Sequence, residues 1–159
     1  MTAKPKVRTC LWFDGRGEEA AEFYTNLLPD SFIESRSYPE PGKPALVVEF
    51  MLAGAPYMTL NGGTMFQHSP AASISVLTKD QAETDKLWDT LIKHGGKESM
   101  CAWLIDGFGI SWQIIPEVLP RMMEAEDKAG AMRAREAMMK MKKIDIAGLQ
   151  AAFDGHTPQ

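Results

Sequence analysis

The order of short extended segments and amphipathic helices repeats once along this 159-residue chain. Residues 7–13 alternate in polarity, which predicts a strand with one apolar face and one mixed face that carries both polar and apolar side chains. Apolar residues then recur at helical spacing over residues 18–28, and three extended runs follow, separated by proline- and glycine-rich breaks. The second half has the same order, although the two halves share almost no residue identity. The predicted elements are residues 7–13, 18–28, 31–38, 45–52 and 57–61, and then 72–77, 78–94, 97–100, 102–105 and 110–115.

This order predicts an α+β fold built from two paired βαβββ modules, at about residues 7–63 and 70–116 of a region that spans residues 1–116. A helix that packs on one face of a four-stranded sheet accounts for the apolar strand face in each half. Thr78, with Gln81 three residues later, has the pattern of a capping box at the start of the second helix. The opposite, mixed faces would form an open cup if the modules pair, within one chain or between chains.

Residues 117–154 predict a C-terminal helical extension that is rich in methionine. Methionine fills irregular gaps well, which favours core packing over the alternative of an adaptable partner or dimer surface. The last helix has one apolar side, formed by Ile146, Leu149 and Phe153, and Asp145 stands at its N-cap position. Because so short a helix is marginal alone, we expect it to dock on its own domain or on a partner subunit.

Composition narrows the possible partners and the compartment. The net charge of −4 argues against a nucleic-acid partner, since phosphate binding needs a basic surface. No apolar run approaches the roughly 18 residues that span a bilayer, so we expect no membrane contact. No apolar segment follows the first residues as in a secretory signal, which favours the cytoplasm. In that compartment Cys10 and Cys101 are expected to be reduced thiols.

Several blocks along the chain match one known pattern. They comprise Leu11-Trp12-Phe13 with Glu18-Glu19-Ala20, Asn61-Gly62-Gly63 with Phe66, Cys101-Ala102-Trp103-Leu104 with Asp106 and Phe108-Gly109, and Ser111-Trp112-Gln113 with Pro116. Together they resemble the PhnB-like branch of the vicinal-oxygen-chelate superfamily, whose members often carry the label demethylubiquinone methyltransferase. The resemblance implies the paired βαβββ fold of glyoxalases, bleomycin resistance proteins and dihydroxybiphenyl dioxygenases. Thr64 stands where the family usually has proline.

The resemblance also raises the question of a metal site. Metal-dependent relatives chelate a divalent ion with His, Glu or Gln on the cup faces of the first, fourth, fifth and eighth strands. The corresponding positions here fall near Arg8, Asn61, Ala71 and Gln113. Arginine stays protonated and offers no lone pair, and alanine offers no donor atom, so we predict no metal site and no cofactor. His68 is the nearest histidine, and a solvated loop residue is the favoured interpretation.

The cup would instead offer aromatic and small polar side chains, which are typical of a small-molecule pocket. An alternative is that side chains and the tail helices fill these faces. The candidate cup-lining residues are Trp12, Tyr57, Thr59, Asn61, Phe66, Ser73, Ser75, Trp103, Ser111 and Gln113. We identify no catalytic residue. Asp106 is the best carboxylate, although a turn aspartate that binds its own backbone is the favoured interpretation.

We therefore expect a metal-free protein that binds a small molecule of unknown identity, and a homodimer. We expect the homodimer because members of the superfamily often build their cups across subunits, and because the last C-terminal helix has an apolar side. One alternative is a metal-dependent lyase, isomerase or dioxygenase of the glyoxalase superfamily. A second alternative is the methyltransferase of the family label. It is disfavoured because the lone Gly15-Arg16-Gly17 pattern lacks the doubly wound sheet that such a nucleotide-binding turn needs.

Overall fold

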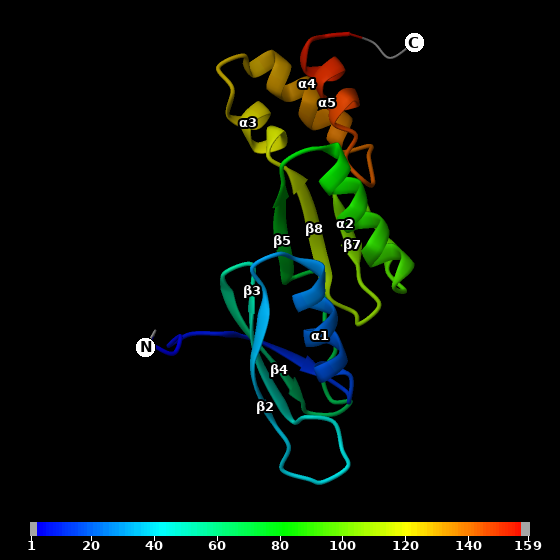
Figure 1. Cartoon of the computed structure of the whole chain (residues 1–159). Coiled ribbons are helices and arrows are strands. Elements are labelled where there is room, and N and C mark those ends of the chain that lie inside the picture. The colour runs from blue at the N-terminus through cyan, green and yellow to red at the C-terminus, as the bar shows by residue number, and fades with distance from the viewer. Residues whose placement is uncertain (1–2, 157–159) are drawn as a thin grey trace. The chain divides into compact units, whose positions relative to one another are not determined.

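The computed structural model describes residues 3–156, which divide into two compact units (Figure 1). The first unit ends at His68 and the second begins at Ser69. Each unit contains one four-stranded sheet and one helix that follows its first strand. The predicted α+β class and the two βαβββ modules are thereby confirmed.

In the first unit, β1 and β4 run parallel at one edge of the sheet, and the remaining pairs are antiparallel. The strand order is β1-β4-β3-β2. Helix α1 packs on one face and buries Tyr24 completely against a core that includes Val48 and Phe50. The elements are β1 (Thr9–Phe13), α1 (Gly17–Leu27), β2 (Phe32–Ser37), β3 (Val47–Leu52) and β4 (Ala55–Asn61).

The second unit repeats this topology with the order β5-β8-β7-β6, and β5 pairs in parallel with β8. Helix α2 covers one face, where Trp88 and Trp112 are almost completely buried. Two of its strands are short, because tight turns interrupt the chain on either side of β7. The elements are β5 (Ser73–Thr78), α2 (Gln81–Lys93), β6 (Lys97–Glu98), β7 (Trp103–Ile105) and β8 (Ser111–Pro116).

The predicted cap of the second helix is wrong by two residues. Thr78 ends β5, is fully buried, and shares a hydrogen bond of 2.6 Å with the hydroxyl of Thr84. Asp80 is the N-cap, since its backbone is extended and its carboxylate accepts from the N–H of Glu83. The pattern of a hydroxyl residue three positions before Gln81 therefore marked a buried strand end.

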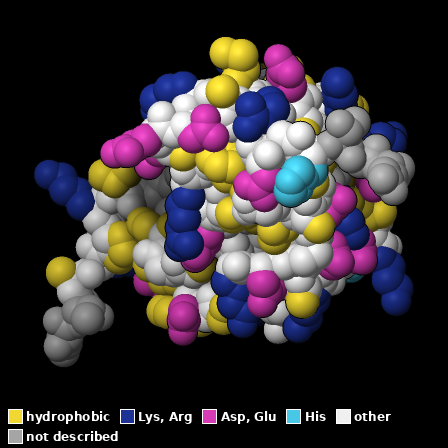
Figure 2. All heavy atoms as spheres, turned by 90° about the horizontal axis from the view of Figure 1, so that it is seen from above, with side chains coloured by type: hydrophobic (Ala, Val, Ile, Leu, Met, Phe, Trp, Pro, Cys, Tyr) yellow, Lys and Arg dark blue, Asp and Glu magenta, His cyan; other side chains and the backbone are white. Residues whose placement is uncertain are grey.

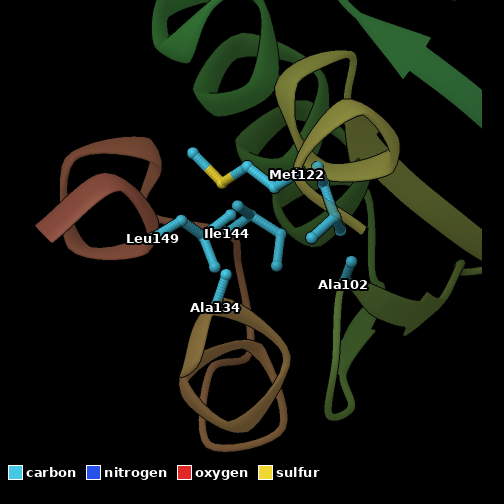
Figure 3. Close-up of a cluster of buried hydrophobic side chains, with 6 residues drawn as sticks. Ala102, Met122, Ala134, Ile144 and Leu149 are labelled. Atoms are coloured by element: carbon cyan, nitrogen blue, oxygen red, sulfur yellow. The ribbon is translucent and has the colours of Figure 1, made fainter. Parts of the chain in front are cut away.

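The C-terminal helices pack within the second unit. They are α3 (Val118–Glu124), α4 (Lys128–Met138) and α5 (Ile146–Phe153). Figure 3 shows how side chains from these helices, from the segment between α4 and α5 and from the β6–β7 segment converge on one buried cluster. Its buried members are Ala102, Leu119, Met122, Ala134, Ile144 and Leu149, with Ile146 and Phe153 packed against them. The apolar side of the last helix is thus covered by its own unit.

The methionines of this extension divide between two environments. Met122 is 5% exposed and belongs to the cluster, whereas Met132 is 63% exposed. Figure 2 shows a face on which hydrophobic side chains alternate with charged side chains of both signs. Among the described residues, no helix is long and apolar enough to cross a bilayer.

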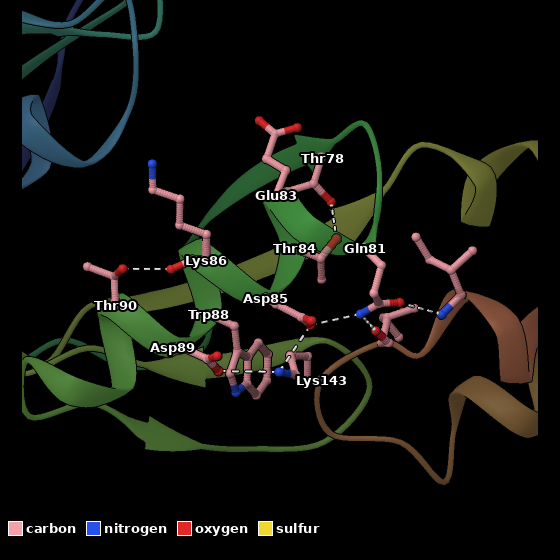
Figure 4. A network of polar contacts seen from close by, with 12 residues as sticks. Thr78, Gln81, Glu83, Thr84, Asp85, Lys86, Trp88, Asp89, Thr90 and Lys143 are labelled. Atoms are coloured by element: carbon pink, nitrogen blue, oxygen red, sulfur yellow. Dashed lines mark hydrogen bonds and ion pairs between the residues drawn. The ribbon is translucent and has the colours of Figure 1, made fainter.

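Gln81 joins helix α2 to the segment that precedes α5 (Figure 4). Its amide donates to the carbonyl of Ile144 at 3.0 Å, and its oxygen accepts from the N–H of Ile146 at 2.9 Å. Lys143 adds ion pairs to Asp85 at 3.1 Å and to Asp89 at 3.3 Å. One side chain therefore pairs with the first N–H of helix α5, which has no partner within the helix, and with the carbonyl of Ile144 just before it.

Replacing Gln81 by Met keeps the side-chain length and removes both contacts to the backbone. We expect the free energy of unfolding to fall by about 1–3 kcal/mol, because half-buried backbone groups lose their partners. Urea unfolding followed by circular dichroism measures the change. Gln150→Met is the matched control, since Gln150 is exposed and its amide binds Asp154 one turn away. Equal losses in the two variants would contradict the assignment.

Candidate functional site

Each sheet has one face covered by the helix of its own unit and one face without it, which we call the helix-free face. In the first unit, strand pairing aligns Trp12 with Leu60 and Cys10 with Met58. Because side chains alternate along a strand, these four residues share the helix-free face. Glu49 of β3, which pairs with Met58, joins them.

Three candidate cup-lining residues lie on the other face of this sheet, against α1. A Cβ atom on Gly17 would lie 3.1 Å from the Cβ of Thr59, and Asn61 Oδ1 accepts from the Gly17 N–H at 2.8 Å. The ring of Tyr57 stacks on Phe50 with centroids 5.6 Å apart, and burial raises the pKa of its hydroxyl. The expectation that Tyr57, Thr59 and Asn61 share a face with Trp12 is therefore corrected. The alternation along β4 was predicted correctly, but the wrong one of its two alternating sets of residues was assigned to the mixed face.

Trp12 and Phe66 do come together. Their ring centroids lie 4.9 Å apart in an edge-to-face arrangement, and Trp12 Nε1 donates to the carbonyl of Gly63 at 2.8 Å. A Cβ on Gly62 would stand 2.3 Å from the indole, so only glycine allows the ring to lie there. Phe66 remains 59% exposed. The glycine pair after Asn61 thus positions an accessible aromatic corner.

The second unit gathers the other five candidates on its helix-free face. The pairing of β5 with β8 sets Ser73 beside Ser111 and Ser75 beside Gln113, and β7 sets Trp103 beside Gln113. Gln113 Nε2 donates to the hydroxyl of Ser73 at 2.9 Å. Ser111 is buried, whereas Ser75 is exposed and Trp103 is half-buried. The face combines hydroxyls, an amide and an indole, which can orient a small polar ligand by hydrogen bonds.

The positions that hold a metal in relatives do not fit a metal here. Arg8 pairs with Glu34 at 2.6 Å and donates to the carbonyl of Tyr57 at 3.1 Å, and the bond to Glu34 raises the pKa of its guanidinium. Asn61 uses both ends of its amide, for Gly17 and for the carbonyl of Ala45. Ala71 has no donor atom in its side chain.

Correcting the faces of β4 does not supply ligands either. The residues on the face of Trp12 are then Met58 and Leu60, of which the thioether is only a weak donor. Desolvation raises the pKa of the Cys10 thiol, which disfavours the thiolate that metals bind. Among residues 3–156, no three side chains of His, Cys, Asp or Glu gather closely enough to hold a metal ion. His68 Nε2 lies 2.6 Å from the carbonyl oxygen of Trp12.

Asp106 has a structural environment. The residue is only 4% exposed. Its carboxylate accepts hydrogen bonds from the N–H groups of Phe108 and Ile110 at 2.8 and 2.9 Å. It also accepts from Trp112 Nε1 at 2.8 Å. These contacts hold the β7–β8 turn and fix the indole in the core. The interpretation as a turn aspartate accounts for them.

A surface pocket of about 280 Å³ lies in the first unit at the ends of β1 and β4, and the sequence analysis did not find it. Its rim includes the loop between β2 and β3, which is rich in proline. The sequence indicates only that this loop interrupts the strands. The pocket could not be predicted from it, because the segments that line the pocket are distant in the sequence. Asn61 lines this pocket although it does not line the helix-free face.

Comparison with known proteins defines the family. The family model described as 3-demethylubiquinone-9 3-methyltransferase matches residues 5–115. A PhnB protein from Bacillus cereus is 31% identical, with a TM-score of 0.63 over 70% of this chain and 99% of that one. The chain belongs to this family. A search of the curated proteins found no match.

Two more distant structures share the fold. Protein PA1353 from Pseudomonas aeruginosa is 22% identical, with a TM-score of 0.58 over 72% of this chain and 98% of that one. The fosfomycin resistance protein FosX from Listeria monocytogenes, solved with Mn(II) and sulfate, is 11% identical. Its TM-score is 0.51 over 72% of this chain and 91% of that one. These likenesses place the family within the glyoxalase-like fold.

The charged end of the helix-free face in the first unit should be sensitive to acid. Hydrogen bonds from Lys4 and Ser35, with the charge of Arg8 nearby, lower the pKa of Glu49. A carboxyl group with a lowered pKa stabilises the fold above its ordinary pKa, and that contribution disappears as the pH falls through the lowered value. The relevant window therefore lies below about pH 5.

We expect Glu49→Gln to lose about 0.5–1 kcal/mol of unfolding free energy at pH 7, because its closest charged partner, Lys4, is largely exposed. The difference from the unaltered protein should shrink steadily below about pH 4. Urea unfolding at a series of pH values measures it. Glu126→Gln removes one charge from an exposed residue and is the control for net charge. Parallel curves for Glu49→Gln and the unaltered protein down to low pH would refute the role of Glu49.

Proposed function

We propose that this protein binds a small organic molecule on its helix-free faces, without a metal ion. The observation that carries the proposal is the set of Ser73, Ser75, Trp103, Ser111 and Gln113 on one face of the second unit. Hydroxyls, an amide and an indole orient a ligand by hydrogen bonds and apolar contact. Trp12 and Phe66 supply a comparable aromatic corner in the first unit.

The absence of metal from this proposal rests on the donor set. Superfamily relatives place ligands on four strands, and here those strands offer Arg8, Cys10, Met58, Ser73 and Gln113 on the helix-free faces. Imidazoles are typical ligands of Zn²⁺ and Fe²⁺ and carboxylates of Mn²⁺ and Mg²⁺, and these strands offer neither group outside the ion pairs of Arg8. The guanidinium of Arg8 offers no lone pair to a metal ion, and the carboxylates of Glu34 and Glu49 are already paired with it.

A homodimer stays part of the proposal, supported by the superfamily habit of building cups across subunits. The apolar tail no longer supports it, because Leu149 is fully buried in its own unit. Sedimentation equilibrium at micromolar concentration distinguishes a dimer from a monomer.

Purified protein tests the proposal on metal and ligand together. We expect elemental analysis after incubation with Mn²⁺ or Zn²⁺ and desalting to find much less than one ion per chain. We expect native mass spectrometry to detect an organic molecule that denaturation releases, and Gln113→Leu to lose it. Gln150→Leu, which alters an exposed glutamine in α5, is the matched control.

One tightly held metal ion per chain would overturn the metal-free proposal and favour a lyase, isomerase or dioxygenase. His68→Ala would then test the nearest imidazole, with His156→Ala as the control in an exposed position. Loss of the ion in the first variant alone would assign His68 as a ligand.

The methyltransferase activity of the family description is a second candidate that we disfavour. Gly17 packs against Thr59 and Asn61, so it serves the contact of helix and sheet. The sheet around it is mixed and has four strands, unlike the doubly wound sheet of common S-adenosylmethionine enzymes. We expect calorimetric titration with S-adenosylmethionine to show no binding at millimolar ligand. Saturable heat with one site per chain would restore that candidate.

A further inference from the structure

The pocket of about 280 Å³ in the first unit forms where three segments meet. The turn after β1 contributes Asp14, the loop between β2 and β3 contributes Pro39, Pro44 and Leu46, and the end of β4 contributes Asn61. This volume is at the lower end of the range for small-molecule sites, which run from about 300 to 1,000 Å³. The pocket therefore suits a fragment-sized ligand.

Its floor is fixed by hydrogen bonds. Asn61 Oδ1 accepts from the Gly17 N–H and Nδ2 donates to the Ala45 carbonyl, both at 2.8 Å. The Asn61 N–H donates to the carbonyl of Leu46 at 2.9 Å. One residue thus joins the start of α1, the end of β4 and the last part of the loop.

The loop that forms the rim is also held at both ends. Glu18 accepts from the Ala45 N–H at 3.0 Å, and it accepts from the hydroxyl of Tyr38. Between these points, three prolines (Pro39, Pro41 and Pro44) restrict the backbone. Glu40 and Lys43 pair with each other across the tip of the loop. The pocket walls are therefore formed before a ligand arrives, which lowers the entropic cost of binding.

The pocket has an apolar wall and one uncompensated charge. Pro39, Pro44 and Leu46 supply the apolar surface. The neighbouring cations are occupied, since Lys43 pairs with Glu40 and Arg16 with Glu19. Asp14 is exposed and makes no hydrogen bond or ion pair with another residue of the described range 3–156. A cation would find a carboxylate at the rim, whereas an anion would be repelled.

We propose that this pocket binds a small organic cation, with its ammonium or guanidinium group at Asp14 and its apolar body against Pro39, Pro44 and Leu46. The site is separate from the helix-free faces, so it goes beyond the function proposed above. Rigid walls, an apolar surface and an available carboxylate together match a monovalent amphipathic cation.

Three probes of nearly equal size test the charge preference. Benzylamine is a cation at neutral pH, benzyl alcohol is neutral and benzoate is an anion. In ¹H–¹⁵N correlation spectra of the full chain, we expect benzylamine to shift the amides of Gly15, Leu46 and Gly63 saturably at millimolar concentration. Benzyl alcohol should bind more weakly, and benzoate should cause no saturable shift. Equal binding of benzoate and benzylamine, or no saturable shift at these amides, would overturn the proposal.

Asp14→Asn keeps the shape of the rim and removes its charge. We expect benzylamine to bind about two- to fivefold more weakly, which is the range for an exposed ion pair, and its preference over benzyl alcohol to disappear. Asp30→Asn makes the same change at the other end of α1, where a φ of 56° suits asparagine, and should leave binding unaltered. Unchanged binding in Asp14→Asn, or an equal loss in both variants, would refute the role of Asp14.

Discussion

The first unit depends on the contacts of one amide side chain, that of Asn61. Helix α1 starts without a side-chain cap from its own N-cap residue, Arg16, so its first N–H groups need another partner. Asn61, 44 residues further along the chain, supplies that partner to Gly17 and also binds the carbonyl of Ala45. Both contacts fall on the α1 face of β4. The helix, the β2–β3 loop and the end of the sheet are therefore fixed relative to one another by a single residue.

Neighbouring residues make this arrangement possible. Gly17 has no side chain, and a Cβ there would lie 2.9 Å from Asn61 Oδ1 and 3.1 Å from Thr59. Gly62 leaves room for the ring of Trp12, whose indole then reaches the carbonyl of Gly63. The block Asn61-Gly62-Gly63 thus serves two faces of one sheet. The amide faces the helix, and the glycines receive an aromatic ring from the helix-free side.

The sequence predicted the fold because a period of two residues marks strands and a period near 3.6 marks helices. It could not decide which of the two alternating sets of residues in β4 faces the helix. Tyr57, Thr59 and Asn61 are more polar than Met58 and Leu60, which favours the face away from the helix. The error arose because polar residues can be buried when their partners are satisfied. Thr59 is 1% exposed, and Asn61 serves the backbone. The five candidates of the second unit were placed on one face correctly, because Ile74 and Trp112 mark the opposite face as apolar.

Arg8 shows how a cation in a mostly covered position of this fold has its charge balanced. Its guanidinium directly precedes the first strand, and its side chain is only 7% exposed. A buried cation requires compensation, which Glu34 and Glu49 provide. Those carboxylates are thereby committed to an ion-pair cluster with Arg8 and Lys4, and they are poorly suited to ligate a second cation. Most of the charge on this face is thereby paired, although Nη2 of Arg8 has no hydrogen-bond partner among the described residues. The neighbouring surface is aromatic and apolar, formed by Trp12, Met58 and Leu60, so hydrophobic contact outweighs free charge there.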